Sequence, residues 1–123
     1  MKSVYGCPVE LSLDLLGGKW KTVILARLKQ GAMGYGELRR AIPGLADKML
    51  TQRLRDLEDD GLVARISSPV TGAGYALTQE GLSLAPVLEA LYGWGVEAAG
   101  RKNARFARGA RFEALAKLSG DAG

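Results

Sequence analysis

Histidine is absent from this sequence of 123 residues, and cysteine occurs once, as Cys7. A single chain therefore cannot form an internal disulfide, a cysteine–histidine zinc site, or a Ser–His or Cys–His catalytic pair. No other nucleophile–base pair and no cluster of metal-ligating residues is evident in the sequence. These absences predict a protein that is not an enzyme and that holds neither a metal ion nor a cofactor.

Long apolar runs are also missing. No stretch approaches the roughly 18 residues that a membrane-spanning helix requires. The N-terminal segment MKSVYGCPVELSLDLLGG has acidic residues within its apolar part and no signal-peptide cleavage pattern. We therefore expect a cytoplasmic protein without a membrane partner. Its 47% hydrophobic and 24% charged residues are typical of an ordinary globular protein.

The positive charge is concentrated at the C-terminus. Residues 101–123 contain six of the 17 basic residues and two of the 13 acidic residues, which accounts for the whole net charge of +4. Residues 1–100 are therefore neutral overall, so a basic surface there must arise from arrangement rather than from excess. We expect one domain over residues 1–100 and a basic extension over residues 101–123.

Apolar spacing and turn residues indicate the secondary structure. Trp20, Val23, Ile24 and Leu28 should share the inward face of one helix. Pro86 should lie in the first turn of the last helix, where proline is tolerated. Helices are expected over residues 8–16, 19–30, 35–42, 46–60 and 80–99, and strands over 62–66 and 75–78 with a turn at 67–74.

Residues 35–60 carry the most informative pattern. Two expected helices are joined by a tight turn at Pro43 and Gly44 and are followed by a β-hairpin, which is the arrangement of a winged helix-turn-helix. Leucines at positions 50, 54 and 57 form the inward stripe of the second helix, and Gly61 suits the left-handed residue that closes a helix. The predicted fold class is mostly α with a small β-hairpin.

The second helix carries its charges in an order that opposes its own dipole. Basic residues come first and four acidic residues crowd the end, whereas the dipole favours anions at the N-terminus. In a winged helix-turn-helix the N-terminal part of this helix enters the DNA major groove, where a polyanion offsets that cost. The alternative is a solvated helix with mixed charges and no partner. The outward residues suited to phosphates and base edges are Lys48, Thr51, Gln52 and Arg55.

Several separate segments resemble one family in their order and spacing. CPVELSLDLLGGKWKTVILARL, GELRRAIPGLADKMLTQRLRDLEDDGLV, YALTQEG and LAPVLEALYGWG are similar to the HxlR-type winged-helix transcriptional regulators of bacteria and archaea, over about residues 6–95. The resemblance implies a dimeric DNA-binding regulator that responds to a small molecule or a redox signal. It also implies that residues 46–60 form the recognition helix, and that the N-terminal region and the long C-terminal helix form the dimer.

The family usually has serine where Ala46 stands. Either Asp47 caps the recognition helix instead, or the start of that helix is looser.

Other basic residues are placed to contact phosphates, which set the register of a protein on DNA without reading its sequence. Lys19 is equally well explained as a solvated surface lysine. The turn of the hairpin has no basic residue, so contacts there would come from backbone amides and from the hydroxyls of Ser67, Ser68 and Thr71. The expected phosphate contacts are Lys21, Arg39, Arg40 and Arg65.

Cys7 immediately precedes Pro8, at the expected start of the first helix. A helix N-terminus stabilises the thiolate, which is the reactive form of cysteine. In some members of the family that the sequence resembles, the corresponding cysteine senses oxidants or electrophiles, so Cys7 is a candidate redox sensor. The alternative is a small, inert residue buried at a dimer contact.

The helix over residues 80–99 has more apolar surface than one small domain can cover, which favours a homodimer. A two-fold dimer would present its recognition helices about 34–36 Å apart to a palindromic operator in double-stranded DNA. Tyr5, Trp20 and Trp94 either line a ligand pocket between subunits or simply pack. The apolar residues of this helix include Leu84, Leu88, Leu91, Tyr92 and Trp94.

Arginines at the start of the C-terminal extension follow helical spacing. Arg101, Arg105 and Arg108 either grip flanking DNA or form an exposed end without a partner.

The sequence thus predicts a dimeric, sequence-specific DNA-binding transcriptional regulator, with a small molecule or an electrophile as a candidate effector. The alternative is a winged-helix module that binds protein rather than DNA, because the main body is neutral and the hairpin turn uncharged. The operator, the regulated genes, the effector, and the choice between repression and activation do not follow from the sequence.

Overall fold

The computed structural model describes residues 3–69 and 72–106. The helix-turn-helix consists of α3 (Tyr35–Ala41) and α4 (Asp47–Asp59), and α2 (Lys21–Leu28) packs against both. The hairpin is formed by β1 (Val63–Ser68) and β2 (Gly72–Leu77), which pair antiparallel. The remaining helices are α1 (Pro8–Leu16), α5 (Gln79–Leu82) and α6 (Ala85–Lys102).

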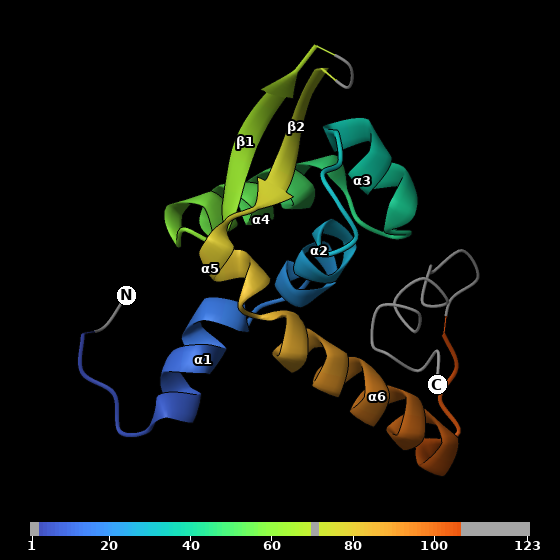
Figure 1. Cartoon of the computed structure of the whole chain (residues 1–123). Coiled ribbons are helices and arrows are strands. Elements are labelled where there is room, and N and C mark those ends of the chain that lie inside the picture. The colour runs from blue at the N-terminus through green and yellow to red at the C-terminus, as the bar shows by residue number, and fades with distance from the viewer. Residues whose placement is uncertain (1–2, 70–71, 107–123) are drawn as a thin grey trace.

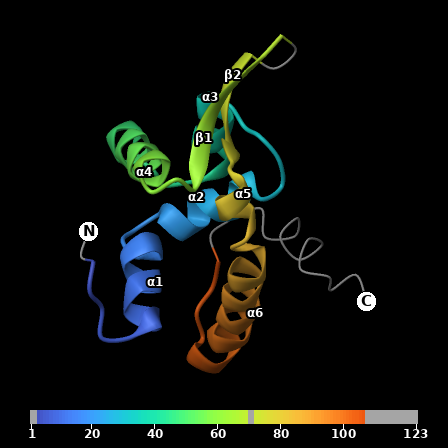
Figure 2. The same ribbon diagram turned by 60° about the vertical axis from the view of Figure 1, so that its left-hand side comes forward.

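The hairpin tip and the helices α1 and α6 lie at opposite ends of the molecule (Figures 1 and 2). α1 and α6 extend away from the body, on the side opposite the hairpin tip, in both views (Figures 1 and 2). This is the expected winged helix-turn-helix, mostly helical with one small hairpin.

The core lies where α2, α3 and α4 meet the start of β1. The inward stripe predicted for α4 is confirmed, because Leu50, Leu54 and Leu57 are each at most 1% exposed. Burying one such side chain contributes roughly 1.5–3 kcal/mol. The stripe packs with Ile24, Leu25, Leu28, Leu38, Ile42, Leu45, Leu62, Val63 and Leu88.

Two glycines set the boundaries of α4. Gly44 (φ +85°) completes the turn after α3, and Gly61 (φ +78°) is the left-handed residue that the sequence predicted after α4. The amide of Leu62 then donates to the carbonyl of Leu57 at 3.0 Å, which caps the end of the helix. An L side chain at either glycine would be strained, so both turns depend on glycine.

The inward face of α2 differs from the prediction. Val23 is 39% exposed, whereas Leu25 is fully buried. Both residues fit an apolar periodicity, and the contacts of α2 with α3 and α4 turn the helix so that Leu25 faces the core with Ile24 and Leu28.

The hairpin is longer than predicted. β1 continues to Ser68 and β2 begins at Gly72, so most of the predicted turn belongs to the strands. Met33 pairs with Tyr75 through two backbone hydrogen bonds of 2.8 and 3.0 Å, which ties the loop before α3 to β2. A single paired residue has no periodicity, and the sequence therefore does not indicate it.

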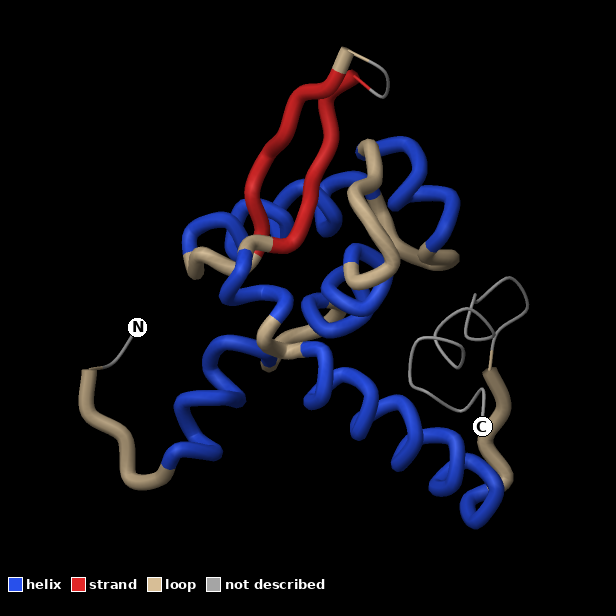
Figure 3. Tube along the Cα trace, viewed as in Figure 1, coloured by secondary structure: helices blue, strands red, loops and turns tan. Residues whose placement is uncertain are grey.

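The predicted helix over residues 80–99 is two helices. α5 ends at Leu82 and α6 starts at Ala85, with a short loop between them (Figure 3). Pro86 lies in the first turn of α6 as predicted. A proline ring clashes with the carbonyl four residues earlier, here Leu82, so a helix cannot run continuously through this point.

α6 ends at Lys102 because Asn103 adopts a left-handed conformation (φ 56°). Arg101 belongs to α6 and lies over the Trp94 ring, with 5.8 Å from its guanidinium carbon to the ring centroid. Arg105 follows the end of the helix, so the expected helical alignment of Arg101 with Arg105 is wrong. Arg108 lies outside the described residues.

α1 and α6 expose apolar side chains. No residue of α1 is buried, and Val9, Leu13, Leu91 and Trp94 are between 51% and 64% exposed. Within residues 3–69 and 72–106, no helix combines the length and apolarity needed to cross a membrane. The two helices therefore present an apolar surface that one protomer leaves uncovered.

Candidate nucleic-acid interface

The outward side of α4 faces solvent. Lys48, Thr51, Gln52 and Arg55 are all exposed, while the leucine stripe on the opposite side is buried. Among the described residues, Lys48 and Arg55 form no ion pair. Both side chains are therefore available to an anionic partner.

A hydrogen-bond network fixes the start of α4 to α3. The Tyr35 hydroxyl lies 3.1 Å from the Asp47 carbonyl oxygen, 3.2 Å from its carboxylate, and 3.3 Å from the Thr51 hydroxyl. Arg39 donates from Nε to the Asp47 carboxylate and from Nη1 to the Leu45 carbonyl, at 2.7 Å for the second bond. The network holds the turn and the first residues of α4 in one arrangement.

Asp47, the candidate replacement for the serine cap, does not cap α4. Ala46 is the N-cap residue and makes no side-chain hydrogen bond. Asp47 is the first helical residue, and its carboxylate accepts from Tyr35 and Arg39. A negative charge in the first turn still interacts favourably with the helix dipole. The contacts with α3 take the place of a serine cap.

The acidic end of α4 is largely paired rather than simply solvated. Asp56 accepts from Arg53 Nη1 at 2.6 Å and from Gln52 Nε2 at 2.9 Å. Glu58 accepts from Arg65 Nε at 3.0 Å. These pairs supply a second reason for the unfavourable charge order, because the acids hold cations of α4 itself and of β1.

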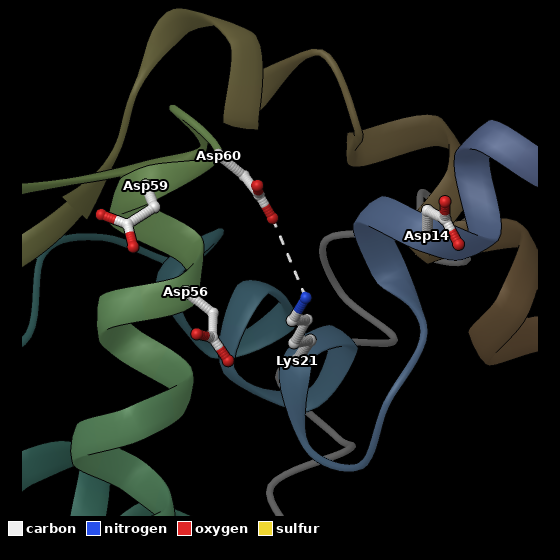
Figure 4. A pocket seen from close by; sticks show the side chains of 5 residues that line it. All are labelled: Asp14, Lys21, Asp56, Asp59 and Asp60. Carbon is white, nitrogen blue, oxygen red and sulfur yellow. Dashed lines mark ion pairs between the residues drawn. The ribbon is translucent and has the colours of Figure 1, made fainter. Parts of the chain in front are cut away.

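Lys21 also lies at the acidic end of α4. It is only 9% exposed, and its Nζ is 3.8 Å from a carboxylate oxygen of Asp60. Figure 4 shows the amino group directed toward Asp60, in a cavity that Asp14, Asp56 and Asp59 also line. The structure does not support the expectation that Lys21 contacts phosphate, because a buried lysine among carboxylates cannot reach DNA without breaking this pair.

The other expected phosphate contacts differ in their freedom. Arg65 is on β1, where it bonds Glu58 and lies over the Tyr75 ring, yet its side chain remains 69% exposed. The hydrogen bond to Glu58 raises the pKa of Arg65 above its usual value, and an arginine side chain is cationic throughout the physiological range in any environment. Arg40 is exposed at the end of α3. Ser67 and Ser68 belong to β1, and Thr71 lies outside the described residues.

Cys7 is exposed and is the N-cap residue of α1. Glu10 holds the segment before the helix, because its carboxylate accepts from the Gly6 amide at 3.1 Å. Burial and the nearby Asp14 carboxylate raise the pKa of Tyr5. Because Cys7 is exposed, its thiol is accessible from solvent in a single protomer.

The described part of the chain contains no group of residues that could bind a metal ion.

The aromatic residues considered for a ligand pocket have different surroundings. Trp20 packs against the core, whereas Trp94 is 64% exposed and lines a shallow apolar groove on α6 with Leu91. A pocket formed by these residues between two subunits stays a prediction.

Known proteins share this architecture. The model of the HxlR-like helix-turn-helix family matches residues 15–103. An uncharacterized HTH-type transcriptional regulator of Methanothermobacter thermautotrophicus is 42% identical over 93 residues, covering 74% of this chain and 71% of the relative.

Solved structures agree with this match. The redox regulator HypR in its oxidized form has 38% sequence identity and a TM-score of 0.68, covering 74% of this chain and 96% of HypR. Quinone-bound YodB from B. subtilis has 33% identity and a TM-score of 0.63, covering 74% of this chain and 99% of YodB. From the helix-turn-helix geometry and these matches, we conclude that the chain belongs to the HxlR-like helix-turn-helix family of transcriptional regulators.

Proposed function

We propose that this DNA-binding regulator acts as a homodimer on a palindromic operator, without enzymatic activity. The observation that carries the proposal is the two-sided character of α4. Its leucine side is buried in the core, while its polar side is exposed to solvent. On this polar side, Lys48 and Arg55 form no ion pair with any residue that the structure describes. A helix presented in this way after a helix-turn-helix turn suits insertion into the major groove.

The exposed residues of α4 divide into two roles. Lys48 and Arg55 are suited to phosphate oxygens or guanine edges, and Gln52 to adenine. Gln52 donates to Asp56 in the free protein, so pairing with a base requires it to exchange that bond. Thr51 lies within hydrogen-bond distance of Tyr35, and its hydroxyl retains a second bond for DNA.

Anchoring falls to cations outside α4. We assign phosphate contacts to Arg40 and Arg65, because both remain exposed. Arg39 acts as a positioning residue, since its bonds to Asp47 and Leu45 hold the turn of the helix-turn-helix. Lys21 stabilises the acidic end of α4 through Asp60 and has no role at the DNA.

The apolar surfaces of α1 and α6 supply the dimer interface. The side chains of Trp94 and Leu13 are each more than 60% exposed, and that of Leu91 is more than 50% exposed. A stable monomer rarely leaves several large apolar side chains uncovered together. A two-fold arrangement through these helices would set the two α4 helices about one turn of DNA apart, at 34–36 Å.

Cys7 is the proposed sensor of oxidants or electrophiles. The similar structures of oxidized HypR and quinone-bound YodB support a response of this kind. Because each chain has one cysteine, two-electron oxidation would join two Cys7 thiols of a dimer in a disulfide, or join Cys7 to a small thiol. An electrophile such as a quinone would instead form a bond between one of its carbon atoms and the sulfur of the Cys7 thiolate. The electron pair displaced onto the electrophile takes up a proton, so this addition needs no oxidant.

DNA selection tests the proposal against the protein-binding alternative. Fragments of genomic DNA bound by the full chain are sequenced, and the enriched site is measured by gel shift with random DNA as competitor. We expect a palindrome whose half-sites are about one helical turn apart. The variant Gln52→Ala should lose preference for the site, whereas the matched variant Gln30→Ala, an exposed glutamine outside α4, should retain it. Equal binding of operator and random DNA would contradict sequence-specific recognition.

A further inference from the structure

The hydroxyl of Tyr35 lies between the start of α4 and the polar side of that helix. It is 3.1 Å from the Asp47 carbonyl oxygen, 3.2 Å from a carboxylate oxygen of Asp47 and 3.3 Å from the Thr51 hydroxyl oxygen. The Tyr35 ring is half-buried and packs against the core, whereas Thr51 is exposed beside Gln52. A residue of α3 thus contacts a side chain that faces DNA in the proposed complex.

These three contacts determine which hydroxyl donates. A tyrosine hydroxyl has one proton and can also accept, whereas carbonyl and carboxylate oxygens only accept. The proton of Tyr35 therefore goes to one of the two Asp47 oxygens. If Tyr35 donated to Thr51 instead, its oxygen would face both Asp47 oxygens with no proton between them. The Thr51 hydroxyl is consequently the donor in its contact with Tyr35.

This direction leaves Thr51 as an acceptor toward DNA. A threonine hydroxyl has one proton and two lone pairs. Within residues 3–69 and 72–106, the Thr51 hydroxyl makes no other hydrogen bond than the one to Tyr35. With its proton directed at Tyr35, only lone pairs remain for a further partner. Thr51 therefore suits an amino group of a base and does not suit a phosphate oxygen, because two acceptors cannot form a hydrogen bond.

In the major groove, this polarity distinguishes two pairs of bases. Adenine and cytosine present an amino group where guanine and thymine present an oxygen. We propose that Tyr35 sets the direction of the Thr51 hydroxyl, so that Thr51 accepts from adenine or cytosine and rejects guanine and thymine on the strand that it faces. The inference rests on the proposed function, which places the polar side of α4 in the major groove. Tyr35 is a positioning residue, because it acts through Thr51.

Operator selection tests the inference with the full chain as wild type, Thr51→Val and Tyr35→Phe. Thr51→Val keeps the branched shape, so the operator position at which this variant loses base preference is the one that Thr51 reads. There the wild type should prefer adenine or cytosine about tenfold over guanine or thymine. Tyr35→Phe keeps the ring and frees the Thr51 proton, and the preference should fall to about twofold or less.

Base analogues test whether Thr51 reads the amino group itself. Deoxynebularine in place of deoxyadenosine, or deoxyzebularine in place of deoxycytidine, replaces the amino group by hydrogen at that position. The analogue should weaken wild-type binding about fivefold and should not weaken binding by Thr51→Val any further. An equal loss for both proteins would show that another residue reads the amino group, and it would overturn the inference.

Two control variants separate hydroxyl direction from structural support. Arg39→Ala also removes a hydrogen bond to Asp47 but keeps the Tyr35 hydroxyl, so it should weaken operator binding and retain the base preference. Tyr75→Phe removes the hydroxyl of another half-buried tyrosine, on β2, and should retain the preference as well. Circular dichroism and urea denaturation check that each variant is folded. A purely structural role of Tyr35 would weaken binding to all operators alike.

Several results would overturn the inference while the enriched operator still supports the proposed function. They are an unchanged preference in Tyr35→Phe, an equal loss of preference in either control variant, a wild-type preference for guanine or thymine at this position, and the absence of any position that depends on Thr51. If the wild type enriches no site at all, the proposed function is contradicted and the inference falls with it.

Discussion

The salt dependence of DNA binding should distinguish cations that contact phosphate from cations that form ion pairs within the protein. The experiment compares the salt dependence of operator binding by two variants of the full chain, Arg40→Ala and Lys21→Gln. Arg40 is exposed at the end of α3, whereas Lys21 is 9% exposed and paired with Asp60. Both substitutions remove one positive charge, so a difference between them reports on location rather than on net charge.

The expected magnitude follows from the number of exposed cations. Four per protomer are assigned to DNA, namely Lys48, Arg55, Arg40 and Arg65, which makes about eight phosphate contacts in a dimer. The slope of log K against log salt is about −0.9 per contact, so it should lie near −7. Arg40→Ala removes two contacts per dimer and should bring the slope to about −5.4. Lys21→Gln should leave the slope unchanged.

Fluorescence anisotropy with a labelled operator, over about 50–200 mM salt, measures these slopes. Each variant keeps the basic extension, so any contribution from residues 101–123 is common to all and cancels in the difference. A wild-type slope steeper than −7 by about 0.9 per contact would assign further phosphates to that extension. A fall of the slope by about 1.8 in Lys21→Gln would refute the reasoning, because a buried lysine would then be contacting DNA.

Four further outcomes are expected. Leu54→Ala should lower the free energy of unfolding by about 3 kcal/mol in urea denaturation, because a 1% exposed leucine leaves a cavity; a loss below 1 kcal/mol would contradict the packing of α4. Arg39→Ala should weaken operator binding without changing the salt slope, whereas a slope change near 1.8 would make Arg39 an anchor. Leu91→Asp should convert the dimer to a monomer in sedimentation velocity while helix content persists, and an unchanged dimer would place the interface elsewhere. Cys7→Ser should bind operator normally and resist release by oxidants; release of this variant would exclude Cys7 as the sensor.

Local rules account for much of the fold. The leucine stripe of α4, the left-handed Gly61 and the Pro43–Gly44 turn were all readable from spacing, because each depends on a few neighbouring residues. The division of residues 80–99 was missed although Pro86 marked it. Its apolar spacing continues across the break, and the clash of the proline ring with the carbonyl four residues earlier outweighs that spacing.

At the candidate site, local sequence patterns predict the polar face of α4 but not the ion pairs between elements. The sequence indicates which face of α4 is polar, because helical periodicity separates it from the leucines. It does not indicate which charged residues form ion pairs across elements. These pairs are Lys21–Asp60, Arg65–Glu58 and Arg39–Asp47. Each of these pairs joins residues from different elements, and their distances depend on how helices and strands pack.

The amino-acid pattern alone therefore specified the helix-turn-helix, its polar face and its family, since these are encoded by spacing along one chain segment. Tertiary packing decided which cations remain free for DNA and which are consumed within the protein. It also decided that residues of α1, α5, α6 and the loops beside them line an open cavity near the end of α4. Ion pairing and cavity shape depend on residues far apart in sequence, and only the folded arrangement brings them within contact distance.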